Sequence, residues 1–153
     1  MANKKQTDIS VFNETMRKFG APDTVIYQHL HWSILLRPAQ VTLGSLVLVA
    51  HDSVSAFSNL SQASFMELHK ITTQIEVTLA HAFKYDKINY LMLMMVDPDV
   101  HFHVIPRYAE PKQFGDIEFI DPGWPGAPDL SHTNKTSPST NLNIIDYITT
   151  CLV

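Results

Sequence analysis

The sequence lacks the features that mark several large classes of protein. Cys151 is the only cysteine among 153 residues, so no internal disulfide can form, which excludes a disulfide-stabilised secreted fold. No apolar run approaches the roughly 18 residues needed to cross a bilayer. The polar start, MANKKQTDIS, has no apolar segment of the kind found in signal peptides. The formal net charge of −4 does not suit a nucleic-acid-binding protein, which usually carries a basic face. We therefore expect a cytoplasmic protein that binds neither membranes nor nucleic acid.

The composition is that of a globular domain. Hydrophobic residues make up 45% of the chain and charged residues 17%, and the length is sufficient to bury a core. We expect a single domain over residues 1–153, with a core at about 24–110 and a C-terminal extension at 111–153. The negative net charge still allows a local cluster of arginine and histidine to bind a small anion.

Hydrophobic periodicity predicts an α+β fold. A long helix is expected to begin at the N-cap Ser61, with apolar residues at steps of three and four through Leu79. Shorter helices are expected at residues 10–19 and 141–152, and loops at 115–130. The expected strands are 24–36 as one long or two short strands, 45–50, 89–96 as a strand buried on both faces, and 100–105. This order predicts a mostly antiparallel sheet of about five strands packed on one long helix.

Residues 97–108 read DPDVHFHVIPRY and carry the most specific pattern. On a strand, alternate side chains face the same side. Asp99, His101 and His103 are therefore expected to share one face. The apolar residues between them are expected to pack under the long helix.

Two kinds of chemistry suit such a face, besides the possibility that these are merely polar residues on a half-exposed strand. Asp99, His101 and His103 could together bind a metal ion. Alternatively, a histidine could attack phosphorus, with Arg107 and Arg37 pairing with phosphate oxygens. The sequence favours phosphorus, because no further carboxylates or cysteines stand at a convincing ligand spacing.

The segment from His101 to Tyr108 resembles the signature strand of the histidine triad (HIT) superfamily, in which three histidines alternate with apolar residues. It is most similar to the branch of dinucleoside polyphosphate hydrolases and the fragile histidine triad protein. Residues 42–49, TLGSLVLV, resemble the family's glycine-containing turn into a strand. The resemblance covers about residues 32–108.

This resemblance implies an activity and a site. Family members are usually homodimers that hydrolyse or transfer nucleoside monophosphates at the α-phosphate. The middle histidine, here His101, is the nucleophile, and His103 contacts the phosphate or the leaving group. Asp99 stands where the family has its first histidine, and Met95 stands where related hydrolases often have a polar amide. Asn89 is a more distant candidate for that role.

The resulting hypothesis is a nucleotidyl-histidine mechanism on a dinucleoside polyphosphate or a nucleoside phosphoramidate. The second ring nitrogen of His101 is expected to bond a backbone carbonyl, which fixes the reactive tautomer. No cofactor is required, although Mg²⁺ could accompany a polyphosphate. Two alternatives stay open, namely a catalytically weak nucleotide-binding module and a small metalloprotein that uses Asp99, His101 and His103.

Several other residues could belong to a site but have simpler interpretations. His29 and His31 suit an exposed or edge position, or else a wall of the nucleotide pocket. Trp32 suits core or dimer packing, and Trp124, in a loop rich in proline and glycine, suits a lid or a dimer contact. Cys151 has no histidine or aspartate partner near it in the sequence and is not proposed as a nucleophile.

Overall fold

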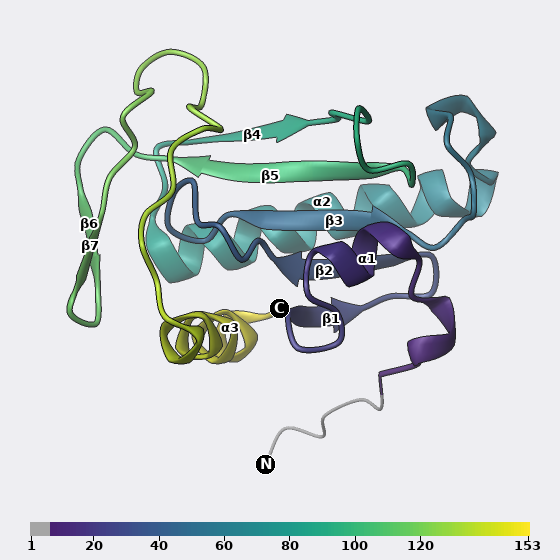
Figure 1. Ribbon diagram of the computed structural model, residues 1–153, viewed down its shortest axis with the longest axis horizontal. Coiled ribbons are helices and arrows are strands. Elements are labelled where there is room, and N and C mark those ends of the chain that lie inside the picture. Colours follow the sequence, from purple (N-terminus) through teal and green to yellow (C-terminus); the bar gives the residue numbers. More distant parts are fainter. Residues whose placement is uncertain (1–6) are drawn as a thin grey trace.

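The computed structural model describes residues 7–153, so most of the polar start lies outside the described residues. The fold is α+β, as the sequence predicts. A five-stranded antiparallel sheet has the order β1-β2-β3-β5-β4 (Figure 1). Its strands are β1 (Val25–Gln28), β2 (Trp32–Leu36), β3 (Leu46–Ala50), β4 (Lys87–Leu91) and β5 (His101–Arg107). The helices are α1 (Glu14–Lys18), α2 (Gln62–Phe83) and α3 (Pro138–Cys151), with 3-10 turns at Ile9–Val11 and Phe57–Asn59.

The long helix α2 covers one face of the sheet and lies behind it in Figure 1. It begins at Ser61, whose side chain accepts a hydrogen bond from the backbone N–H of Ser64, as the capping pattern predicts. Trp32 is fully buried on this face and donates its ring N–H to the Ser64 carbonyl at 2.8 Å. Apolar side chains of α2, the sheet and α3 form the main core between them. Trp32 is therefore a core residue.

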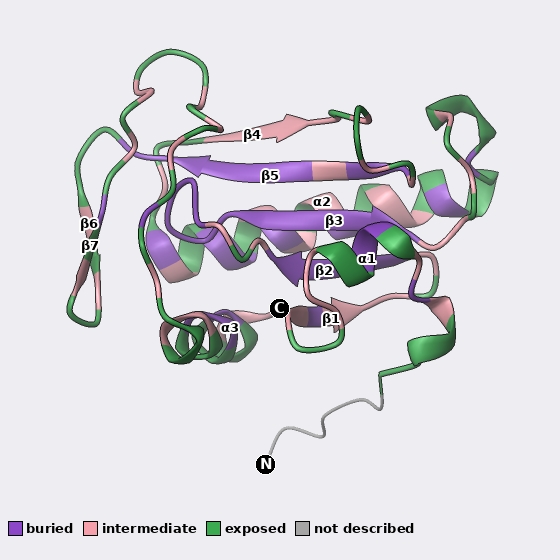
Figure 2. Cartoon of the chain, in the orientation of Figure 1, coloured by how far each residue is buried: buried purple, intermediate pink, exposed green. Residues whose placement is uncertain are grey.

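The opposite face of the sheet is covered by the N-terminal segment, with α1 in front of the strands (Figure 1). Phe12 and Met16 form a second, smaller apolar cluster with Leu35, Val47 and Val49 of β2 and β3. The sheet is consequently buried on both faces at its centre, and β2, β3 and most of β5 are buried (Figure 2). No helix within residues 7–153 combines the length and apolar character needed to cross a membrane.

Two expected elements differ in the structure. The helix expected at 10–19 is divided, because Asn13 is extended and its side chain caps a new helix by accepting from Met16 N–H. The strand expected at 89–96 ends at Leu91 and is an edge strand, while Met95 and Val96 are 89% and 81% exposed. Periodicity cannot show whether a continuous apolar run is buried, and here its second half lies at the surface.

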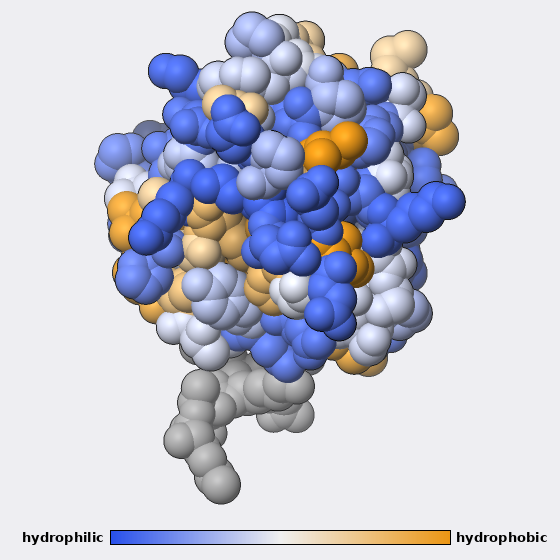
Figure 3. Space-filling view, turned by 90° about the vertical axis from the view of Figure 1, so that its left-hand side faces the viewer, coloured by the Kyte–Doolittle hydropathy of each residue, from blue (hydrophilic) through white to orange (hydrophobic). Residues whose placement is uncertain are grey.

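The C-terminal extension is more structured than the expected loop. It contains a hairpin of β6 (Lys112–Phe114) and β7 (Ile117–Phe119). Asn134 then bonds the chain back to the domain, because its amide donates to the carbonyls of Gln40, Val41 and Ile120. The end of the molecule at the left of Figure 1, seen face-on in Figure 3, is mostly hydrophilic.

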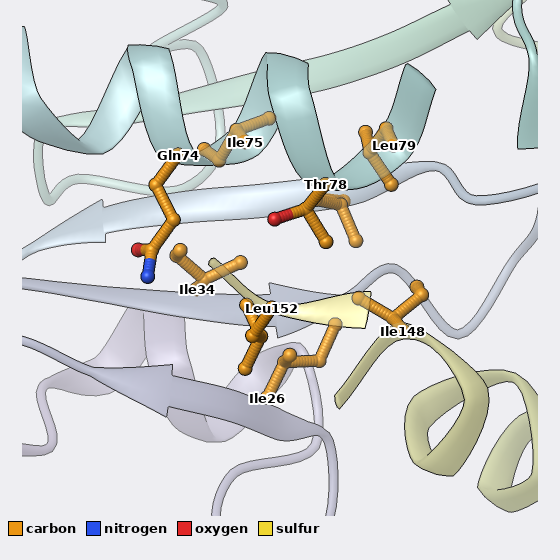
Figure 4. A pocket seen from close by; sticks show the side chains of 9 residues that line it. Ile26, Ile34, Gln74, Ile75, Thr78, Leu79, Ile148 and Leu152 are labelled. Atoms are coloured by element: carbon orange, nitrogen blue, oxygen red, sulfur yellow. The ribbon is translucent and has the colours of Figure 1, made fainter. Parts of the chain in front are cut away.

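Helix α3 and the last residues close the core beside β1. A small apolar cavity of about 10 Å³ lies there, with Ile148 and Leu152 on one side and Ile75 and Leu79 of α2 on the other (Figure 4). This volume is about that of one water-sized probe, so the cavity is a packing defect and too small for a ligand.

Candidate active site

The two histidines lie side by side on β5, in the interior of the sheet. His101 is paired with Val49 and His103 with Val47 across β3, so both side chains project from the face that α1 covers. Their ring centroids are 5.1 Å apart. His101 is fully buried and His103 is 7% exposed. The predicted alternation is confirmed, because Phe102 and Val104 pack into the core on the α2 side.

The tautomer of His101 is fixed by the backbone. Its Nδ1 lies 2.7 Å from the carbonyl oxygen of Asp99. A carbonyl oxygen can only accept, so Nδ1 carries a proton, and in the neutral ring the lone pair is on Nε2. Nε2 is buried and has no hydrogen-bond partner in the described chain. The ring therefore has a nitrogen without a hydrogen-bond partner in the described chain, as attack on phosphorus requires, although burial keeps this nitrogen out of contact with solvent.

His103 is held in its neutral form. Burial lowers its pKa to about 4, and the positive charges of nearby groups, Arg37 among them, act in the same direction. Its Nδ1 is buried and has no hydrogen-bond partner among residues 7–153. A neutral imidazole at pH 7 can donate one hydrogen bond and accept another, so His103 suits contact with a phosphate oxygen or a leaving group.

Arg37 is the predicted substrate-binding residue that the structure places best. It follows β2, and its backbone N–H donates to Ser45, so by strand alternation its side chain lies on the histidine face. Its Nη1 donates to the Ala39 carbonyl, while Nε is buried and has no hydrogen-bond partner in the part of the chain that the structure describes. Its charge is close enough to lower the pKa of His103. Arg37 is thus a half-buried cation near the histidines whose Nε–H is available to bind a ligand.

Arg107 and Asn89 are placed differently from the sequence prediction. At about 3.3 Å per residue, Arg107 is about 20 Å along the strand from His101, too far to share one phosphate. Arg107 is 3% exposed, and its guanidinium forms a bidentate ion pair with Asp121, at 2.7 and 3.0 Å. It also donates to Asn89 Oδ1 and to the Gly126 carbonyl, both at 2.9 Å. These contacts argue against a role in substrate binding and assign both residues to the attachment of the C-terminal extension.

The Asp99 carboxylate is engaged by the N-terminal helix α1. It accepts from Thr15 N–H at 3.1 Å, and the Asp99 N–H donates to Thr15 Oγ1 at 3.3 Å. Within residues 7–153, no three histidine, cysteine or acidic side chains converge in a way that could hold a metal ion. The geometry therefore does not favour the alternative of a metal site made from Asp99, His101 and His103.

Phe19, at the end of the segment expected to be helical at 10–19, lies beside both histidines. Its ring centroid lies 6.1 Å from that of His101 and 5.7 Å from that of His103. No motif marks it, since the contact joins residues more than 80 positions apart. His29 and His31 lie elsewhere and line a surface groove with α2. Trp124 is half-buried in the loop after β7.

Comparisons with known proteins agree with this geometry. The model of the HIT domain matches residues 18–110. No curated protein matches the chain. A histidine triad protein from Sinorhizobium meliloti 1021 has a similar structure, with a TM-score of 0.72 and 20% identity over 92% of this chain and 96% of that chain. A histidine triad protein from Marinobacter aquaeolei VT8 has a TM-score of 0.68 and 18% identity, over 84% of this chain and 87% of that chain. The C. elegans NitFhit protein has a TM-score of 0.55 and 17% identity, over 82% of this chain and 26% of that chain. The chain therefore belongs to the HIT domain family.

Proposed function

We propose that this protein transfers a nucleoside monophosphate group to His101 and then to water. The observation that carries the proposal is the state of the His101 ring, whose Nδ1 is bonded to the Asp99 carbonyl and whose Nε2 is free. An imidazole fixed in this way is a nucleophile that needs no further activation by a base. Membership of the HIT domain family supports a reaction on a nucleotide.

The proposed reaction has two steps, attack by His101 and hydrolysis of the intermediate. In the first, His101 Nε2 forms a bond to the α-phosphorus while the bond from phosphorus to the leaving group breaks, and the leaving group takes up a proton. In the second, a water oxygen bonds to phosphorus, the N–P bond breaks, and the water loses a proton. Arg37 and neutral His103 would stabilise the oxygens around phosphorus, because charge on them is redistributed in the transition state.

We propose dinucleoside polyphosphates and nucleoside phosphoramidates as the substrates. Both present an α-phosphorus attached to a good leaving group, and the similarity of the signature strand to that of the dinucleoside polyphosphate hydrolases favours the former. Mg²⁺ would assist only by neutralising a polyphosphate chain. Reaction in the cytoplasm stays a prediction from the sequence.

A covalent trap tests the proposal. The wild-type protein is mixed with diadenosine polyphosphates or an adenosine phosphoramidate, quenched rapidly and examined by intact mass. We expect one added adenosine monophosphate on the wild type and none on His101→Ala. His101→Asn is the matched variant, because an amide keeps a polar group of similar size but cannot form the adduct. Turnover by His101→Asn would contradict the mechanism.

The alternative is a nucleotide-binding module with weak catalysis. Two observations favour it. The burial of His101 separates the nucleophile from solvent, and Asp99 replaces the first histidine of the family motif. Tight nucleotide binding with neither adduct nor turnover would support this alternative.

We also propose a homodimer formed along β4. The outer edge of β4 is unpaired within the described chain, and Met95 and Val96 just beyond it are exposed. A free strand edge beside exposed apolar side chains is suited to pairing with a second copy. Light scattering after gel filtration should give a dimer, and Val96→Asp should shift it to monomer. A monomeric wild type would exclude this interface.

A further inference from the structure

Asp97 and Asp99 bind the N-terminal segment to the catalytic strand. The Asp99 carboxylate accepts from the backbone N–H of Thr15, which lies in the first turn of α1, and Thr15 Oγ1 accepts from Asp99 N–H. Three residues along α1, the ammonium group of Lys18 forms an ion pair with Asp97. The two carboxylates on either side of Pro98 therefore hold α1 at two points, directly before the strand that carries His101.

The segment held in this way covers both histidines. The Phe19 ring contacts both imidazoles, and Met16, which is fully buried, packs on the neighbouring strands. His101 has no exposed surface, and its Nε2 is out of contact with solvent and has no hydrogen-bond partner within the described residues. A phosphorus atom cannot come within bonding distance of Nε2 while α1 and Phe19 remain in this position.

We infer that α1 is a lid over the catalytic histidines and that Asp97 and Asp99 are the latch that keeps it closed. The inference rests on the proposed function, since it makes opening of the lid the step that admits the nucleotide. It also gives a role to Asp99, which replaces the first histidine of the triad. Where the family has its first histidine, this chain has a positioning residue that acts on α1 and not on the phosphate.

The chemistry of the latch suits repeated opening. A carboxylate is an effective partner for the free N–H groups at the start of a helix, which have no partner within the helix itself. Lys18 is about half exposed, so its ion pair with Asp97 is partly screened by solvent. Gly20 follows α1 with a φ of +90°, a backbone conformation that glycine adopts readily and that marks the end of the helix.

Chemical modification of His101 tests the lid without any turnover. Diethyl pyrocarbonate acylates neutral imidazole nitrogens that solvent can reach, and peptide mass spectrometry locates the product. His69, an exposed histidine on α2, serves as the internal reference in each digest. The proteins compared are the wild type, Asp99→Ala, Asp99→His, Lys18→Met and the control Lys70→Met, which removes an exposed lysine of α2.

We expect Asp99→Ala and Asp99→His to raise the rate of His101 modification about tenfold, which corresponds to about 1.4 kcal/mol in favour of the open form. Lys18→Met should raise it about threefold, as for a weak surface ion pair, and Lys70→Met should leave it unchanged. Exchange of the Thr15 amide hydrogen should quicken in the same order. Lys18→Met changes only an exposed side chain, so it tests the lid even if a variant at Asp99 does not fold.

The outcomes separate the lid from the proposed reaction. Modification of His101 at the wild-type rate in both Asp99→Ala and Lys18→Met would overturn the latch, whatever the activity. Faster modification in these variants would support the latch, even if no nucleotidyl adduct formed in any of them. In that case the proposal of nucleotidyl transfer would be wrong, and the proposal of the lid would be supported.

Discussion

The neutral state of His103 makes the stability of the protein depend on pH in a specific range. Its pKa is about 4 in the folded protein, against an ordinary value of 6.5. Between these values the unfolded chain binds a proton that the folded chain does not, so the free energy of unfolding falls as the pH is lowered from about 6.5 towards 4. This single group should remove about 2 kcal/mol by pH 5 and about 3 kcal/mol by pH 4.

Urea unfolding between pH 4 and 7 measures this effect. Acidic groups also titrate in this range, so the informative quantity is the difference between the wild type and His103→Gln at each pH. The loss of stability on acidification should be smaller in His103→Gln by about 2 kcal/mol at pH 5. The exposed His69→Gln is the matched control and should keep the wild-type slope. Equal slopes for the wild type and His103→Gln would refute the assignment of a neutral, buried His103.

Three further predictions concern the rest of the framework. Arg107→Met should lower the free energy of unfolding by about 3–5 kcal/mol, because it leaves the Asp121 carboxylate buried without its cation; chemical denaturation checks this, and recovery in the double variant with Asp121→Asn is expected. Gly44→Ala should cost about 2–4 kcal/mol, since φ is +81° and the new Cβ would lie 2.7 Å from the Phe83 ring; an unchanged melting temperature would contradict this. Asn134→Ala should cost about 3 kcal/mol, because it removes the side-chain hydrogen bonds to the Val41 carbonyl and to the N–H and carbonyl of Ile120; faster proteolysis of the C-terminal extension would be its local readout.

The sequence predicts those parts of the fold that depend on local periodicity. The alternation of His101 and His103 with apolar residues is a property of any strand, and the stripe from Ser61 to Leu79 is a property of any amphipathic helix. Both features are therefore found where they are expected. The exposure of Met95 could not be predicted in this way, because a continuous apolar run looks the same whether or not another element covers it.

The roles of the charged residues depended on partners that are distant in the sequence. Asp99 was expected to face the substrate, but its partner Thr15 is 84 positions away. Arg107 was expected to reach the phosphate because it is near His101 in the sequence. On an extended strand, however, a separation of six residues corresponds to a distance of about 20 Å. Arg37, which is farther away in the sequence, lies nearer the histidines because β2 and β3 fold back beside β5. Proximity in a strand sequence is thus a poor guide to which charges meet.

The ion pair between Arg107 and Asp121 has a consequence for how the chain can be divided. The HIT domain match ends at residue 110, before Asp121 and before the Gly126 carbonyl that Arg107 also binds. A protein shortened to that boundary would retain His101, His103 and every strand of the main sheet, yet its guanidinium would lose the groups that neutralise it. The residues matched by the HIT domain model therefore do not include the groups that neutralise Arg107, and a shortened version of the protein should keep the chain through α3.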